Sequence, residues 1–190
     1  MASLAEHKSS HITKLMLIGD SGTGKTGALA SLAKAGYSLH IIDFDNGLDI
    51  LANTLRGDKE AMARVEFETF IDDMRNVGGK IQATTAKAWQ GAIKTLTDWN
   101  PAKWGEKDIL VVDSLTFAGR AALRFICGMN GRLGSAPYQS DFLDAQRLVE
   151  NLLGMLFSNS IPCNVIVLSH IREVGRTTTI ILADNKPIHV

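Results

Sequence analysis

Short apolar runs alternate along the chain with longer segments in which apolar residues recur at helical spacing. The apolar runs predict buried strands at 14–18, 38–42, 109–112 and 164–168. The helical pattern covers 25–35, 48–54, 84–99, 114–126 and 141–158. Segment 65–70 alternates apolar and acidic residues, which predicts a half-exposed or edge strand. This alternation favours an α/β fold, in which a mostly parallel sheet lies between two layers of helices.

The remaining segments carry turn and loop signals. Segment 98–106 contains Pro101 and Gly105, and 127–138 is rich in glycine, so both predict loops. Segments 177–183 and 187–190 predict a C-terminal β-hairpin with Asp184 and Asn185 at its turn. We expect a flexible N-terminus over 1–12 and one domain over 13–190.

Composition narrows the class of protein. The 190 residues have a formal net charge of zero, which argues against a general polyanion-binding surface but leaves open a local basic patch. Cys127 and Cys163 are too few for a disulfide framework, and their spacing does not fit a zinc site. No apolar run approaches the ~18–20 residues that span a bilayer, and the polar N-terminus lacks the apolar stretch of a signal peptide. We therefore expect a cytoplasmic protein with no membrane partner.

Polar side chains stand where the predicted strands end. They are Asp20, Asp43, Asp45, Asp113, Ser169 and His170. Ligands of parallel α/β sheets bind at the carboxyl ends of the strands. We therefore expect these residues, far apart in sequence, to lie along one edge of the sheet.

A complete Walker A pattern follows the first strand and opens the first helix. Its glycines allow successive backbone N–H groups to surround phosphate oxygens, and the helix N-terminus favours the same anion. Lys25 is expected to reach the β- and γ-phosphates of ATP, and the Thr26 hydroxyl to bind Mg²⁺. The predicted nucleotide-binding residues are Gly19, Asp20, Ser21, Gly22, Thr23, Gly24, Lys25, Thr26 and Gly27.

The other strand ends suggest roles in catalysis. Asp113 is a candidate Mg²⁺ ligand; the alternative is a cap on the next helix. Asp45 is the candidate base that activates the attacking water, with Asp43 second, and the alternative is that either residue only fixes the turn before Gly47. His170 is a candidate sensor of the γ-phosphate, and its alternative is a structural role.

Taken together, these segments resemble the RecA-like branch of P-loop ATPases over residues 12–175. Segment 41–49 is similar to the RecA segment that carries the catalytic glutamate, although the shorter Asp45 stands in that place. Segment 110–115 is similar to the RecA Walker B strand, and in 165–172 His170 stands where RecA has a sensing glutamine. The histidine, the compact size and the segment 43–47 look most like small phage-encoded RecA-like ATPases linked to single-strand annealing and recombination.

The resemblance implies an Mg-ATP-dependent ATPase that acts on single-stranded DNA in phage recombination, annealing or repair. It also implies a homo-oligomer, a ring or a filament, with nucleotide at the subunit interfaces. The DNA-contacting loops of RecA match 128–139 and 171–179 here, and the alternative for both is solvated surface. The candidate contacts in and near these loops are Arg120, Arg124, Arg132, Tyr138, Arg172 and Arg176.

One departure from RecA concerns the C-terminal end. RecA-type cores continue with more sheet and supply basic residues to the neighbouring subunit's site, whereas this sequence ends at Val190. Lys186 or Arg176 would have to serve that purpose. Two other functions remain open: a nucleotide-controlled assembly module with little hydrolysis, and a small-molecule P-loop kinase.

Overall fold

The computed structural model describes residues 11–171, 179–181 and 187–189, and its centre is a parallel sheet. The strands lie in the order β1-β7-β6-β2-β3, and every neighbouring pair is parallel. Their bounds are β1 Lys14–Gly19, β2 Ser38–Asp43, β3 Val65–Thr69, β6 Asp108–Asp113 and β7 Asn164–His170. The predicted parallel α/β sheet is confirmed, including the edge position of β3.

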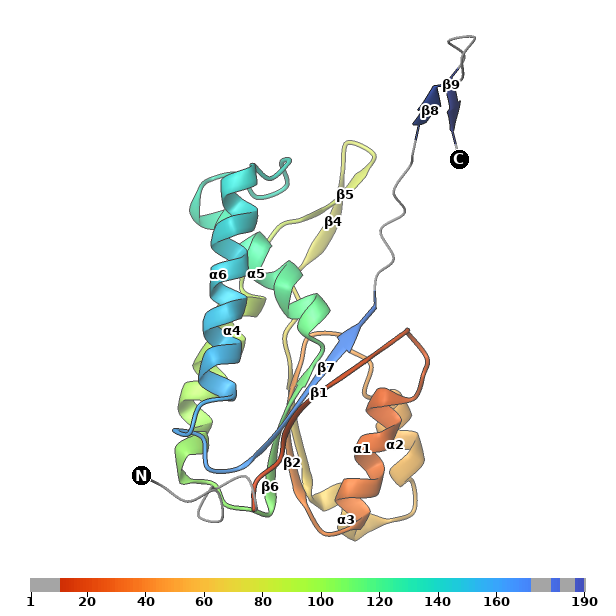
Figure 1. The fold of residues 1–190 in the computed structure, drawn as a ribbon, viewed down its shortest axis with the longest axis vertical. Coiled ribbons are helices and arrows are strands. Elements are labelled where there is room, and N and C mark those ends of the chain that lie inside the picture. The colour runs from red at the N-terminus through yellow and green to blue at the C-terminus, as the bar shows by residue number, and fades with distance from the viewer. Residues whose placement is uncertain (1–10, 172–178, 182–186, 190) are drawn as a thin grey trace.

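Helices cover both faces of this sheet (Figure 1). One layer contains α1 (Lys25–Lys34), α2 (Asp49–Leu55) and α3 (Lys59–Ala63); the other contains α4 (Ala88–Trp99), the 3₁₀ turn η3 (Pro101–Lys103), α5 (Leu115–Met129) and α6 (Gln139–Leu156). Because side chains alternate across a strand, β6 contributes to two separate cores. Leu110 and Val112 belong to the core under α4–α6, and Ile109 and Val111 to the core under α1–α3.

The register of the strands sets the position of their polar ends. Asp43 lies opposite Asp113 between β2 and β6, and Gly19 lies opposite His170 between β1 and β7. The four carboxyl ends therefore meet at one edge, as the sequence predicts.

Two helix boundaries differ from the prediction. The predicted loop 127–138 is wrong at its start, because α5 continues to Met129. Gly128 lies inside this helix where Ala86 packs closely against it, because a Cβ on Gly128 would be 3.1 Å from the Cβ of Ala86. The predicted helix 84–99 begins later, at Ala88, whose N–H donates to Asp72 Oδ1 at 2.9 Å.

Two β-hairpins accompany the main sheet. β8 (Thr179–Ile181) and β9 (Pro187–His189) pair antiparallel, in agreement with the predicted C-terminal hairpin, whose turn lies outside the described residues. The second hairpin, β4 (Met74–Val77) and β5 (Lys80–Ala83), was not predicted. Gly78 and Gly79 form its turn at φ +59° and +83°. A Gly-Gly pair is a recognised hairpin signal, but the flanking residues lack clear alternation.

An aromatic cluster closes the amino-terminal end of the sheet. The His40 ring of β2 stacks on Trp104 at a centroid distance of 3.9 Å and meets the edge of Trp99 at 6.0 Å. Its two nitrogens lie 3.1 Å from carboxylate oxygens of Glu66 and Asp108. Cross-strand polar contacts and ring stacking thus fasten β2 to both of its neighbours and to the end of α4.

Candidate functional site

The phosphate loop lies where the sequence places it, between β1 and α1. Gly22 and Gly24 have φ of +80° and +85°, the left-handed region that favours glycine. Gly24 is the N-cap residue of α1, and because glycine has no side chain, no side-chain cap hydrogen bond is made. The first N–H groups of this ten-residue helix therefore face an open, exposed loop that suits an anion.

Lys25 folds back over the loop. Its Nζ donates to the carbonyl oxygens of Gly19 and Asp20 at 2.8 and 2.7 Å. The same nitrogen lies 3.5 Å from Nδ1 of His170. The ammonium group is thus held at the mouth of the loop, beside the end of β7.

The predicted pair of Mg²⁺ ligands is brought together. The Thr26 hydroxyl donates to Asp113 Oδ2 at 2.8 Å. Asp113 is only 2% exposed, and burial, the main cause, together with the charges of Asp43 and Asp45, raises the pKa of its carboxyl group. A divalent cation would offset the cost of burying this negative charge. The alternative role as a helix cap is not seen, because α5 has Ser114 at its N-cap and no side-chain cap bond.

These two residues fit Mg²⁺ only with help from the nucleotide. Among the described residues no group of three or more His, Cys, Asp or Glu could hold a metal ion. Mg²⁺ usually takes one or two protein ligands and completes its shell with phosphate oxygens and water. A hydroxyl and a buried carboxylate beside a phosphate loop match that requirement.

Asp45 and His170 also meet at this edge. His170 Nε2 lies 3.0 Å from Asp45 Oδ2, and both side chains are partly exposed. The His170 backbone N–H donates to Thr116 Oγ1 at 3.0 Å, and its ring packs edge-on against Phe117 at 5.9 Å. Lys25, His170 and Asp45 therefore form a continuous line of polar contacts across the strand ends.

Asp43 has a different position from Asp45. It is 1% exposed, and its Oδ1 accepts hydrogen bonds from the N–H groups of Asp45 and Asn46, both at 2.9 Å. Its Oδ2 accepts from the Thr69 hydroxyl at 2.9 Å, and burial is the main cause that raises its pKa. All these contacts fix the turn that presents Asp45.

The arginines that the sequence placed near DNA are engaged within the protein. Arg132 Nε donates to Asp141 Oδ2 at 3.2 Å, and its guanidinium lies 4.4 Å from the Tyr138 ring centroid. Arg124 lies 3.6 Å from Asp72 Oδ2. Arg120 stacks over Phe117 at 4.7 Å. Arg172, Arg176 and Lys186 lie outside the described residues.

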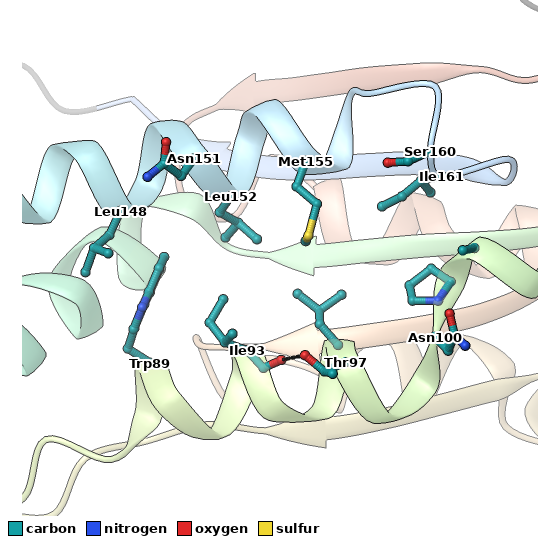
Figure 2. Close-up of a pocket in the computed structure, with 13 residues that line it drawn as sticks. Trp89, Ile93, Thr97, Asn100, Leu148, Asn151, Leu152, Met155, Ser160 and Ile161 are labelled. Atoms are coloured by element: carbon teal, nitrogen blue, oxygen red, sulfur yellow. Dashed lines mark hydrogen bonds between the residues drawn. The ribbon is translucent and has the colours of Figure 1, made fainter.

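A large apolar groove lies away from this edge, between α4 and α6 (Figure 2). It encloses about 480 Å³, and Trp89 and Ile93 of α4 face Leu148, Leu152 and Met155 of α6 across it. None of its lining residues belongs to the phosphate loop or to the ends of the strands. The groove is therefore separate from the nucleotide site.

Strand order, phosphate loop and buried acid define a P-loop NTPase fold with a RecA-like sheet. The sequence profile of an AAA-domain family matches residues 12–181, and the chain belongs to this family. No curated protein sequence matches the chain. No helix among the described residues is long and apolar enough to cross a membrane.

Solved structures with a similar fold are distant in sequence. The ATPase of a type III secretion system of pathogenic bacteria is 15% identical with a TM-score of 0.55, over 86% of this chain and 47% of that one. The assembled ATPase EscN of enteropathogenic E. coli, in complex with its stalk EscO, is 16% identical with a TM-score of 0.52, over 85% and 38%. The RadB recombinase is 17% identical with a TM-score of 0.47, over 83% and 61%. The chain thus spans about half the length, or less, of the two secretion ATPases.

Proposed function

We propose that this protein binds Mg-ATP and hydrolyses it, and that it acts on single-stranded DNA in phage recombination, annealing or repair. One observation carries the ATPase part. The side chains of Lys25, Thr26 and Asp113 meet beside the phosphate loop, and the Asp45–His170 pair closes the same edge. A Gly-rich turn with no nucleotide function would not require this arrangement.

Each side chain has a distinct part in the proposed reaction. Lys25 would exchange the carbonyl oxygens of its own loop for β- and γ-phosphate oxygens. Thr26 and Asp113 would hold Mg²⁺, which supplies positive charge against the phosphates. Asp45 would accept a proton from the attacking water, because it is partly exposed and its turn is fixed by Asp43.

His170 would connect the phosphate to the rest of the chain. Its ring lies between the Lys25 ammonium and the Asp45 carboxylate, at 3.5 and 3.0 Å. A γ-phosphate that draws Lys25 away would change the partners of this ring. The backbone of His170, hydrogen-bonded to Thr116, would then pass the change to the segment that follows β7 and to α5.

Two features support the DNA part of the proposal. It rests on the resemblance of the strand-end segments to RecA and on the exposed ring of Tyr138, which is 62% accessible in the loop before α6. Aromatic rings of this kind stack on unpaired bases. A phage-encoded protein with this function would work in the host cytoplasm, as a homo-oligomer.

The test is ATP turnover with and without single-stranded DNA. We expect turnover above background in both cases and a higher rate with DNA. Absence of turnover in both would contradict the enzymatic proposal. If ATP is hydrolysed but no DNA binds at low salt in the presence of nucleotide, the ATPase proposal stands and the DNA proposal fails.

A further inference from the structure

The unpredicted hairpin β4–β5, residues 74–83, is the most exposed regular element beside the nucleotide edge. All four residues of β4 and the first two of β5 are exposed. Figure 1 shows it extending past the carboxyl edge of the main sheet, towards the end where α5 is connected to α6. We call residues 74–83 the ribbon.

The register gives the ribbon two different faces. Residues directly opposite each other in an antiparallel pair share a face, and alternate pairs share it too. Arg75 pairs with Gln82 and Val77 with Lys80, so these four residues form one face. The other face carries Met74, Asn76, Ile81 and Ala83. The first face is cationic and contains no acidic residue.

The two ribbon cations differ from their basic neighbours. Lys87 lies 3.1 Å from Asp73, Arg124 lies 3.6 Å from Asp72, and Arg132 is bound to the buried Asp141. Neither Arg75 nor Lys80 makes an ion pair within the part of the chain that the structure describes. Their positive charge therefore remains available to an outside anion.

The ribbon lies against the loop that precedes α6. A Cβ on Gly134 would be 2.9 Å from Gln82 Oε1, so the Gln82 side chain lies closely against the backbone of this loop. Met74 and Ile81 of the ribbon line the same groove as Leu133 and Pro137, which encloses about 250 Å³. Tyr138 follows directly after this loop. The ribbon thus borders the loop that leads to Tyr138, and its cationic face and its apolar face both lie beside this loop.

We infer that the ribbon binds single-stranded nucleic acid on its cationic face, with Arg75 and Lys80 on phosphates and Val77, which lies on the same face, against the bases. Val77 is 52% exposed. As diagonal neighbours, Arg75 and Lys80 lie about 7–8 Å apart in their Cα positions, so both can reach one strand. Charge decides between occupants: two exposed cations without an ion pair among the described residues favour a polyanion over a second copy of a chain with zero net charge.

This inference rests on the proposed function. In it, the ribbon supplies the cations that the loop before α6 lacks. The sequence alone predicted Arg132 for that purpose, but Asp141 neutralises it. The ribbon would thus provide the electrostatic attraction, and the Tyr138 loop the stacking surface.

The test measures binding of a fluorescent oligo(dT) by anisotropy, with a non-hydrolysable ATP analogue present. The variant is the double change Arg75→Gln and Lys80→Gln. The matched control, Lys59→Gln and Lys103→Gln, removes two exposed lysines from α3 and η3. We expect about tenfold weaker binding for the ribbon variant and a slope of log K against log salt that is less steep by about 1.4. The control should bind like the wild type.

The outcomes separate the two proposals. If the wild type binds no oligo(dT) at low salt, the DNA part of the proposed function fails and this inference fails with it. If the wild type binds and the ribbon variant keeps both affinity and salt slope, only the inference is overturned. A ribbon variant that changes the mass measured by light scattering while keeping its DNA affinity would identify an interface between copies, and would also overturn it. Equal unfolding temperatures of the variant and the wild type verify the fold.

Discussion

At the scale of single residues, two aspartates two positions apart have different surroundings. Asp43 is enclosed by hydrogen bonds that fix a turn, whereas Asp45 reaches the strand-end edge and contacts His170. We expect Asp45→Asn to lower kcat for ATP by about 10²–10⁴-fold, because an amide accepts no proton. ATP affinity should stay close to that of the wild type. Asp49→Asn, an exposed change at the start of α2, is the control and should keep full turnover.

Lys25 provides the strongest test of the phosphate loop. Hydrogen bonds to charged groups contribute about 1.5–3 kcal/mol each, so Lys25→Ala should weaken ATP binding by about a hundredfold or more. Lys34→Ala, in the last turn of the same helix, should bind ATP normally. Calorimetric titration with ATP gives both affinities. Equal affinities in the two variants would contradict the assignment of the loop.

Asp113 should lower the stability of the protein when no nucleotide is bound. Its folded pKa is raised above 3.8, mainly by burial, so the folded chain holds this proton to higher pH than the unfolded chain. The ionised carboxylate therefore destabilises the fold above the raised pKa, and this cost disappears as pH falls towards 3.8. Asp113→Asn should raise the melting temperature at neutral pH by about 2–4 °C for each kcal/mol regained.

The same Asp113 variant should lose its response to the ligand. Mg-ATP stabilises the wild type through binding to the folded state, by about 2.7 kcal/mol at a hundredfold excess over Kd. Thermal melts with and without Mg-ATP, at neutral and acidic pH, measure both effects. A variant that melts below the wild type without nucleotide would show that the buried charge is not the destabilising group.

The sequence placed most residues of the candidate site at strand ends, and the structure brings them together at one edge of the sheet. Their chemical roles stay predictions. The sequence left open which aspartate fixes the turn. That distinction depends on two backbone N–H groups that point at Asp43 Oδ1, and residue identities do not encode such directions. Asp141 was predicted only as the start of an amphipathic helix, although its carboxylate accepts hydrogen bonds from Arg132 and from the N–H of Tyr138.

At the scale of elements, glycines inside helices have opposite effects on stability. Gly91 in α4 lies against Phe70, and an added Cβ would be 3.0 Å from the ring. Gly154 in α6 has no atom within 4 Å of such a Cβ. We expect Gly91→Ala to destabilise by about 1–3 kcal/mol and Gly154→Ala to stabilise by up to about 1 kcal/mol. Urea unfolding of the two variants measures both, and the same sign for both would contradict this packing.

The elements that the sequence predicted are those with strong periodicity. The β strands of the main sheet follow from their apolar runs, and α5 and α6 from their apolar faces. Gly128 was predicted to lie in a loop because segment 127–138 is rich in glycine, and the close approach of Ala86 explains its place in a helix. The ribbon was missed because both its faces are exposed, so burial imposes no alternation on its sequence.

At the scale of the whole molecule, the phosphate loop is open to solvent, and its residues from Ser21 to Gly24 are exposed. We expect a second copy to cover it when ATP is bound, which would raise the mass measured by light scattering with a non-hydrolysable analogue compared with ADP. Lys25→Ala should show no such difference. An unchanged mass of the wild type would speak against both the oligomer and the nucleotide-controlled assembly module.

The aromatic cluster around His40 has a practical consequence for spectroscopy. All three tryptophans of the sequence, Trp89, Trp99 and Trp104, belong to α4 or directly follow η3, in the layer that also forms the groove of Figure 2. The tryptophan emission of the protein therefore reports on this layer alone. We expect this emission to stay constant during titration with ATP and to shift to the red on unfolding. It would then serve as an internal reference for signals from labelled DNA or labelled nucleotide.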